Sequence, residues 1–210
     1  MNIFEQKILE IYPPETIMAG TDETGRGCLA GPLVVSAVIL PTDYFNPAIK
    51  DSKKLTVKQR TMLATEIMNV AISYTIEIMS VKMVETLNPK QASIIGMQNA
   101  IDKLTVKPAL ILTDAEKLAP SYHYQAIIDG DNLSQSIAAA SILAKVTRDN
   151  LMLEYDQTYP QYDFKNNKGY GTKKHLSALQ KYGVTAIHRK TYRPVREIIL
   201  KNISLLINKN

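Results

Sequence analysis

The chain has 210 residues, of which 45% are hydrophobic and 21% charged, and this is ordinary for one globular domain. Lysine and arginine outnumber aspartate and glutamate by 25 to 20, which suits a polyanionic partner. A single cysteine, Cys28, excludes an internal disulfide and a thiolate zinc cluster and favours a reducing compartment. No signal peptide or membrane span is recognisable, so we expect a cytoplasmic protein.

The first part of the sequence predicts three strands and two helices. The expected elements are a helix over 1–11, strands over 17–22 and 33–40, a helix from Thr56 to about 69, and a strand over 71–79. Thr56 has the side chain of an N-cap, and Pro13-Pro14 ends the first helix. Short links between the three strands favour an antiparallel meander.

Helical patterns dominate the rest of the chain. The expected elements are two helices over 81–104 divided at Asn88-Pro89, buried strands over 109–113 and 123–128, a long helix from Ser134 to about 155, and helices over 173–182 and 194–207. The segment 161–172 is polar and basic and predicts a surface loop. The order of elements indicates a single α/β domain over 1–210 with a mixed five-stranded sheet flanked by helices and a helical C-terminal extension from about 173.

Carboxylates follow three of the predicted strands. Asp22 and Glu23 end the first strand, Asp114 follows the fourth, and Asp131 follows the fifth within Asp129-Gly130-Asp131. A cluster of oxygen ligands without histidine or thiol prefers Mg²⁺ or Mn²⁺ to zinc. Two such ions about 3.5–4 Å apart can activate water and stabilise the leaving oxygen of a phosphodiester. The residues alone therefore predict metal-assisted chemistry on a phosphate, with solvated loop acids as the alternative.

Several longer strings together resemble the ribonuclease HII family. In chain order they are GTDETGRGCLAGPLVVSAVIL at 20–40, DSKKL at 51–55, GD at 130–131, SIAAASILAKVTRD at 136–149, YPQYDFKNNKGYGTKKH at 159–175 and HRKTYRPV at 188–195. The resemblance covers roughly residues 15–197.

The resemblance implies a ribonuclease H-like fold in which Asp22, Glu23, Asp114 and Asp131 are the catalytic and metal-binding carboxylates, with Asp22 bridging the metal positions. It further implies an endonuclease that uses Mg²⁺ or Mn²⁺ to cut the RNA strand of RNA–DNA hybrids. Such an enzyme also nicks duplex DNA on the 5′ side of an embedded ribonucleotide and leaves a 3′-hydroxyl and a 5′-phosphate.

The resemblance also assigns substrate recognition. Gly25, Arg26 and Gly27 match the turn that recognises the ribonucleotide, and glycines let backbone groups approach the 2′-hydroxyl that distinguishes RNA from DNA. Tyr170 matches the tyrosine that stacks on the next sugar. Basic positions that resemble those around the family's substrate groove are Lys53, which we rank first for a phosphate contact, then Lys54, Lys145, Arg148, His188 and Arg189.

Three positions depart from the family pattern. Ala115 follows Asp114 where the family has glycine, so a positive φ there would strain the backbone and make Glu116 a candidate accessory acid. The Gly-Asp order selects Asp131 over Asp129, and Cys28 stands where proline is common.

Two alternative functions stay open at this point. Ribonuclease HIII cleaves hybrids but handles single ribonucleotides poorly, and Arg26 and the short N-terminal segment argue against it. A catalytically silent hybrid-binding module is disfavoured by the four intact carboxylates. We expect a monomer that binds RNA–DNA hybrids and ribonucleotide-containing duplex DNA, and the sequence gives no support for a replication-clamp partner.

Overall fold

The computed structural model describes residues 2–13 and 15–207, which form two compact units. The first unit comprises Met1–Thr24, Val34–Ile78 and Ser93–Thr147 and contains the sheet. The second comprises Gly25–Leu33, Met79–Ala92 and Arg148–Asn210 and is built mainly from helices and loops. Pro14 and residues 208–210, which belong to the predicted first helix end and C-terminal extension, lie outside the described residues.

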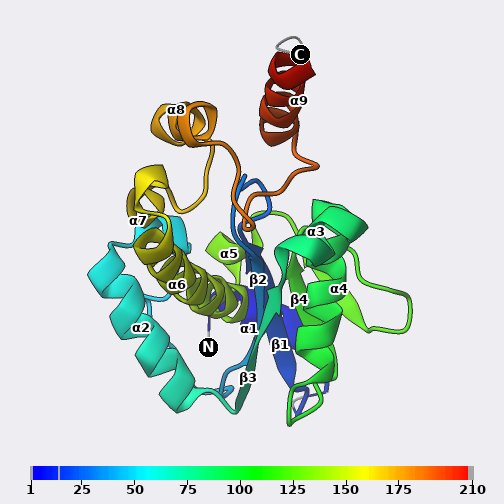
Figure 1. The fold of residues 1–210 in the computed structure, drawn as a ribbon. Helices are drawn as coiled ribbons and strands as arrows, with labels where there is room; N and C mark the ends of the chain where they lie inside the picture. Colours follow the sequence, from blue (N-terminus) through cyan, green and yellow to red (C-terminus); the bar gives the residue numbers. More distant parts are fainter. Residues whose placement is uncertain (1, 14, 208–210) are drawn as a thin grey trace. The chain divides into compact units, whose positions relative to one another are not determined.

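The sheet has five strands in the order β3-β2-β1-β4-β5 (Figure 1). Their bounds are β1 Met18–Thr24, β2 Leu33–Ile39, β3 Ser73–Met79, β4 Leu110–Asp114 and β5 Tyr124–Ile127. β1 pairs antiparallel with β2 and parallel with β4, and β4 pairs parallel with β5. The predicted mixed five-stranded α/β sheet is confirmed.

The helices agree closely with the sequence pattern. Their bounds are α1 Ile3–Leu9, η1 Ser52–Lys54, α2 Val57–Val70, α3 Val81–Leu87, α4 Pro89–Asp102, α5 Gly130–Leu133, α6 Gln135–Thr158, η2 Pro160–Tyr162, α7 Phe164–Asn167, α8 Lys173–Tyr182 and α9 Arg193–Ile207. Thr56 caps α2 in a capping box with Gln59, as its position predicted. None of the described helices is both long and apolar enough to span a membrane.

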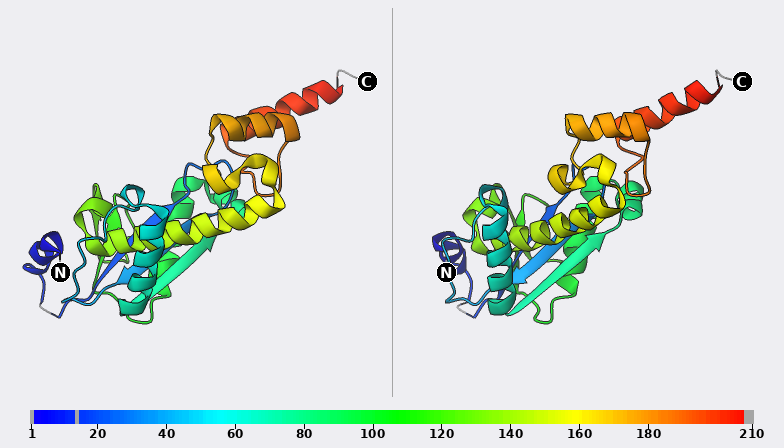
Figure 2. Two further views of the ribbon diagram at one scale, coloured as in Figure 1. Left: turned by 90° about the vertical axis from the view of Figure 1, so that its left-hand side faces the viewer. Right: turned by 60° about the vertical axis from the view of Figure 1, so that its left-hand side comes forward.

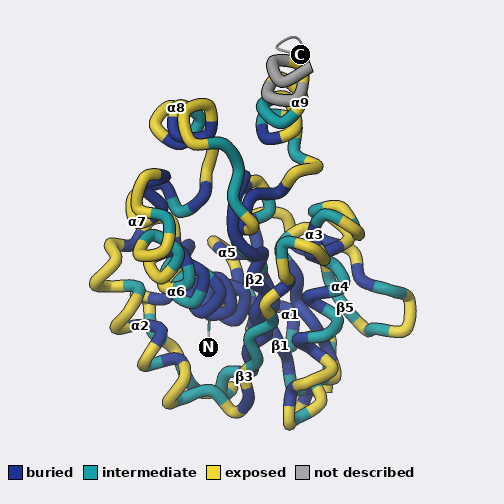
Figure 3. The backbone as a smooth tube through the Cα atoms, in the orientation of Figure 1, coloured by how far each residue is buried: buried dark blue, intermediate teal, exposed yellow. Residues whose placement is uncertain are grey.

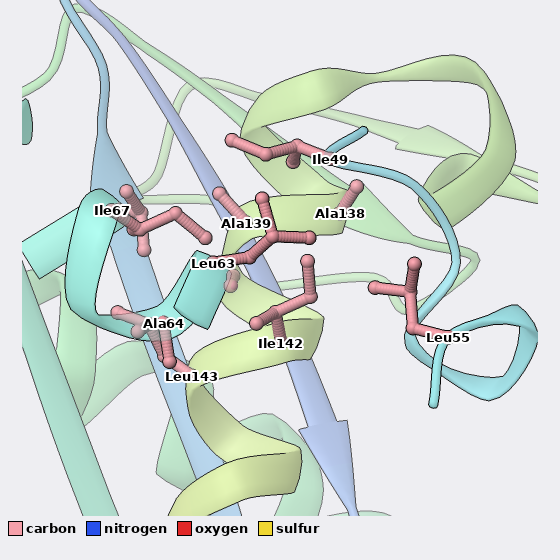
Figure 4. Packing of buried hydrophobic residues seen from close by; sticks show 11 residues of the cluster. Ile49, Leu55, Leu63, Ala64, Ile67, Ala138, Ala139, Ile142 and Leu143 are labelled. Atoms are coloured by element: carbon pink, nitrogen blue, oxygen red, sulfur yellow. The ribbon is translucent and has the colours of Figure 1, made fainter. Parts of the chain in front are cut away.

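In the first unit, helices cover both faces of the sheet. α2 and α6 lie on one face and α4 on the other (Figure 1), and every residue of β2, which lies between β3 and β1, is buried (Figure 3). Leu63 and Ile67 of α2 point toward Ala139 and Ile142 of α6 (Figure 4). The small residues of α6 allow close approach: a Cβ on Gly20 of β1 would lie 2.1 Å from the backbone of Ser136.

A buried glutamate joins α1 to the start of α6. Glu5 is 3% exposed, and one of its carboxylate oxygens accepts hydrogen bonds from the hydroxyl of Ser134 at 2.6 Å and the backbone N–H of Ser136 at 2.8 Å. Both views in Figure 2 place α1, the dark blue helix, beside the start of α6. A carboxylate at this position satisfies free N–H groups and complements the helix dipole.

The second unit corrects one prediction. The segment 161–172 is not simply a polar surface loop, because it contains α7 and the end of η2. Tyr162 and Phe164 are 1% and 0% exposed, stack with ring centroids 5.4 Å apart, and belong to a core with Leu179 and Val195. The polar residues around these two aromatics hid a buried pair.

Candidate active site

The parallel pairing of β1 and β4 brings two acids to the same edge of the sheet. Thr21 lies opposite Thr113 in the register, so the following residues, Asp22 and Asp114, emerge together. Asp131 reaches this edge differently. It lies in the short helix α5 after β5 and not at a strand end, because Asp129 adopts a left-handed conformation that turns the chain.

Asp22, Asp114 and Asp131 form a carboxylate trio. One oxygen from each lies within 4.8 Å of the others. The backbone orients two of them: the N–H of Gly130 donates to Asp114 Oδ1 at 2.9 Å, and the N–H of Glu23 donates to Asp22 Oδ1 at 2.7 Å. The trio supplies only oxygen ligands, which is the donor set that hard divalent cations prefer.

Repulsion and burial act together on Asp22. Burial raises the pKa of Asp22 well above its ordinary value, and the charges of Glu23 and Asp114 raise it further, while a hydrogen bond from Ser141 acts in the opposite direction. Glu23 is thus an electrostatic neighbour of the trio although its carboxylate is not a member of it. A cation between these groups would relieve the repulsion that raises the pKa.

Lys53 lies beside the trio. Its Nζ donates to Asp131 Oδ2 at 3.2 Å and lies 3.8 Å from an oxygen of Asp51. Burial acts to lower the pKa of Lys53, but the charges of Asp131, Asp51 and Asp22 outweigh it and raise the pKa. Burial raises the pKa of Asp131 and the Lys53 ammonium opposes this shift. Lys53 therefore partly neutralises the cluster.

Asp51 and Ser141 contribute to this electrostatic arrangement but were not selected from the sequence. Asp51 is 7% exposed and lies in the DSKKL string, whereas Ser141 is one of the small residues of α6 and also contacts the Ser52 hydroxyl. Both residues lie in strings that carry the family resemblance, DSKKL at 51–55 and SIAAASILAKVTRD at 136–149, and this is the signal that could have found them.

Ala115 has the positive φ under which the sequence implied a strained backbone. Its φ is 57°, in the left-handed region, and its N–H donates to the carbonyl of Ile127 at 2.9 Å. Asp114 therefore belongs to the trio although alanine stands at position 115 where the family has glycine. Glu116 is 8% exposed, and its backbone carbonyl accepts a hydrogen bond from the Thr113 hydroxyl.

The second unit contains the glycine turn. The N–H of Cys28 donates to the carbonyl of Gly25 at 3.3 Å and closes the turn. Gly25 has a φ of +94°, and a Cβ there would lie 2.1 Å from Arg148 Nε. A Cβ on Gly27 would meet no atom within 4 Å. The structure therefore requires glycine at position 25 and sets no such requirement at position 27.

Two buried arginines hold this segment by its backbone carbonyls. Arg148 donates to the carbonyls of Pro32, Ala30 and Lys168 at 2.9, 3.1 and 2.8 Å. Arg189 donates to the carbonyl of Gly31 through both Nε and Nη2, and to that of Arg26 through Nη1 at 2.9 Å. Burial lowers the pKa of Arg189 from its usual value, and the neighbouring Tyr192 opposes this shift.

This arrangement corrects the assignment of Arg148, His188 and Arg189 to the substrate groove. All three residues are 0% exposed, so they do not present phosphate contacts. Arg148 and Arg189 instead support the turn segment from within. Buried guanidinium groups need several acceptors, and backbone carbonyls supply them here.

Tyr170 directly follows Gly169, which forms hydrogen bonds with the segment after the glycine turn. The carbonyl of Gly169 accepts from the N–H groups of Leu29 and Ala30 at 2.8 and 3.3 Å. Tyr170 itself is 43% exposed, with the Arg148 guanidinium carbon 5.9 Å from its ring centre. Burial raises the pKa of Tyr170, and a hydrogen bond with Cys28 adds to the shift. A half-exposed ring on a braced loop can serve as a stacking surface.

The chain is similar in sequence and in fold to known ribonucleases. A sequence model described as ribonuclease HII matches residues 19–195. A ribonuclease HII of Mycoplasma mycoides is 55% identical over 185 residues, covering 87% of this chain and 89% of that protein. The ribonuclease H2 structure from Pyrococcus horikoshii superposes with a TM-score of 0.75 at 25% identity, covering 87% and 96% of the two chains. RNase HII from Archaeoglobus fulgidus, in a structure with PCNA, gives 0.72 at 24% identity, covering 86% and 96%.

Proposed function

Since the chain belongs to the ribonuclease HII family, we propose that this ribonuclease H cuts the RNA strand of RNA–DNA hybrids and nicks duplex DNA 5′ of a single embedded ribonucleotide. The observation that supports this most directly is the trio of Asp22, Asp114 and Asp131, with one oxygen from each within 4.8 Å of the others. The products would carry a 3′-hydroxyl and a 5′-phosphate.

In this proposal Asp22, Asp114 and Asp131, together with Glu23, hold the metal. Bound Mg²⁺ or Mn²⁺ would supply Lewis-acid stabilisation of the charge that develops on the phosphate. The side chain of Lys53 is 77% exposed at its site beside Asp131. It can therefore exchange its contact with the carboxylate for one with a substrate phosphate.

The second unit would supply recognition. The exposed, unobstructed backbone at Gly27 can approach a 2′-hydroxyl, which both donates and accepts hydrogen bonds. The buried arginines fix the carbonyls of Arg26 and Gly31, so that the turn is organised before substrate arrives. Tyr170 would stack on the sugar that follows the ribonucleotide.

We further infer a monomeric cytoplasmic enzyme with one catalytic domain over 1–210. A replication clamp is a candidate partner only on the precedent of the Archaeoglobus complex. Sedimentation of the purified chain tests the monomer directly, and a dimer would contradict it.

One cleavage experiment tests the proposed function. Three labelled duplexes are compared with Mg²⁺, with Mn²⁺ and with a chelator: DNA that holds one ribonucleotide, a hybrid with an all-RNA strand, and all-DNA. We expect metal-dependent nicking of the first two and none of the third. Cleavage of the long hybrid alone would favour a ribonuclease HIII-like specificity, and binding without cleavage would favour a silent module.

A further inference from the structure

Two buried histidines of the second unit contact each other beneath Tyr170. His175 of α8 and His188 are both 0% exposed, and their Nε2 atoms lie 3.0 Å apart. Aromatic rings surround them: the centroid of Tyr162 lies 5.0 Å from that of His188, and the centroid of Phe164 lies 5.3 Å from that of His175. Neither histidine has a role in the proposed chemistry.

The outer partners of the pair determine where both protons lie. The backbone N–H and the hydroxyl oxygen of Thr185 lie 2.9 and 2.8 Å from His188 Nδ1. Because the backbone N–H can only donate, this nitrogen accepts, and the hydroxyl can donate to it as well. The carbonyl of Tyr170 is 2.9 Å from His175 Nδ1, so this nitrogen donates. A neutral His188 then carries its proton on Nε2 and donates it to the bare Nε2 of His175. The result is one directed chain that runs from Thr185 to Tyr170.

This chain requires both rings to be neutral. A second proton on His175 would face the N–H of His188, and a second proton on His188 would face the N–H of Thr185. Burial lowers the pKa of both histidines, that of His188 to about 3 with the charge of His175 adding to the effect.

Other titratable and charged groups belong to the segments around the histidine pair. They are Tyr162 of η2, whose hydroxyl donates to Gly183, Tyr182 at the end of α8, the Asp163–Lys174 ion pair, and Arg148 and Arg189, which bind backbone carbonyls. All the hydrogen-bond partners of the two rings named above are neutral, so they give no reason for either ring to become charged.

From this geometry we propose that His175 is a positioning residue for Tyr170, kept in the required tautomer by His188. The carbonyl of Tyr170 also accepts from the N–H of Thr172 at 2.8 Å, and the N–H of Tyr170 donates to Asn167. His175 is therefore a side chain of α8 that binds this short loop, in addition to the Thr172 cap. The inference rests on the proposed function, because it matters for catalysis only if Tyr170 reads the RNA–DNA junction.

The protonation pattern can be tested on the wild-type chain. The sequence has three histidines, so nitrogen NMR of the imidazoles shows three ring systems, and His123 is the exposed one. At neutral pH we expect a proton on Nδ1 of His175 and on Nε2 of His188. A charged ring, or a proton on Nε2 of His175, would overturn the proposal. This result does not depend on any activity.

Two variants test the consequence for cleavage. Junction preference is defined as the cleavage rate on a single embedded ribonucleotide divided by the rate on an all-RNA strand. His175→Leu removes the donor to Tyr170, whereas His175→Asn keeps an N–H near the position of Nδ1. We expect His175→Leu to lower junction preference about five-fold, the effect of one ordinary hydrogen bond, and His175→Asn to keep most of it.

The controls separate the possible failures. Melting temperatures establish that each variant is folded, and His123→Asn should leave junction preference unchanged. Equal losses on both substrates for folded His175→Leu would assign His175 a merely structural role and overturn the proposal. If His175→Leu does not fold, the test rests on His175→Asn. A five-fold loss of junction preference in that variant would overturn the proposal, and a junction preference close to wild type would support it. Wild-type protein that cleaves neither substrate would defeat the proposed function, while the expected proton positions would still support the hydrogen-bond chain.

Discussion

Arg148 occupies the space that a side chain at Gly25 would need. A Cβ at position 25 would lie 2.1 Å from Arg148 Nε and 2.7 Å from its Cδ, and the residue's φ of +94° already disfavours any other amino acid. Gly27, two residues later, has neither constraint. The structure thus gives an internal reason for one glycine of the turn, and the other is free to serve a ligand.

The two glycines should respond differently to alanine. Gly25→Ala should lower the free energy of unfolding by about 1–3 kcal/mol, because it combines a strained φ with a clash against a buried guanidinium. Gly27→Ala should leave stability within about 0.5 kcal/mol but reduce nicking at a single ribonucleotide about 10-fold or more, because a methyl group would separate substrate and backbone. Urea unfolding and cleavage rates measure the two effects. A normal rate in Gly27→Ala would exclude close backbone approach at this residue.

Most of the local structure could be predicted because its signals are local. Alternating apolar residues predict β3, the threonine before Val57 predicts the start of α2, and Asn88-Pro89 separates α3 from α4. The approach of Asp22 and Asp114 also follows from sequence, since each residue ends its strand and parallel strands expose the same ends at one edge.

The remainder depends on contacts between residues distant in the chain. Arg189 binds the carbonyl of Gly31, 158 residues away, and Glu5 caps a helix 131 residues later at Ser136. Charged side chains are usually exposed, so a single sequence indicates exposed phosphate contacts at Arg148 and Arg189 and not the buried supports that the structure has. Asp131 was selected from the sequence and lies in the trio, but its place on α5 depends on the left-handed turn at Asp129.

Asp22→Asn should separate stability from activity. Cleavage should fall at least about 100-fold, because several kcal/mol of metal-dependent charge stabilisation are lost, while hybrid binding survives through backbone contacts. The folded-state pKa of Asp22 is raised, so its ionised form opposes folding above the unfolded pKa. The variant should therefore melt at a higher temperature in chelator and gain less stability from Mn²⁺. More than a few per cent of wild-type activity would remove Asp22 from the centre of the mechanism.

Alanine variants of Asp114 and Glu116 test which acid binds metal at the strand end where Ala115 replaces the family glycine. Asp114 belongs to the trio and Glu116 does not, so Asp114→Ala should lose about 100-fold or more in rate and Glu116→Ala should cleave nearly normally. Stabilisation by Mn²⁺ provides a second readout, and only Asp114→Ala should reduce it. The reverse pattern would mean that Glu116 is the ligand.

Acid should destabilise the second unit through His188. Its pKa is about 3 in the folded chain and about 6.5 when unfolded. Between these values the unfolded chain binds more protons, so the stabilisation is complete above pH ~6.5 and decreases as the pH falls, by about 1.4 kcal/mol per unit.

The raised pKa of Asp22 changes stability in the opposite direction, so the contribution of His188 must be isolated with a variant. In His188→Asn the amide oxygen can still accept from Thr185, but the titrating ring is absent. Urea unfolding between pH 7 and 5 should show wild type losing its advantage over this variant as the pH falls. If the free energies of unfolding of the two proteins changed in parallel with pH, His188 would not be buried in its neutral form.

Tyr170 should matter most where RNA passes to DNA. Its ring is 43% exposed, and its backbone is tied to Asn167, Thr172 and His175. Stacking on an aromatic ring contributes about 1–3 kcal/mol, so Tyr170→Ala should lose about 10- to 100-fold on a single embedded ribonucleotide. Cleavage within an all-RNA strand should fall less, because no junction is read there.

Phenylalanine at position 170 separates the ring from the hydroxyl. Tyr170→Phe removes the hydrogen bond with Cys28 but keeps the aromatic face beside Arg148. If stacking dominates, this variant retains most of the wild-type junction preference and Tyr170→Ala does not. The three proteins are compared on both substrates at one salt concentration, because salt changes backbone affinity for every variant. Equal losses on the two substrates would reduce Tyr170 to a residue of general binding or folding, since a ring that reads the junction must affect the substrate with the isolated ribonucleotide more.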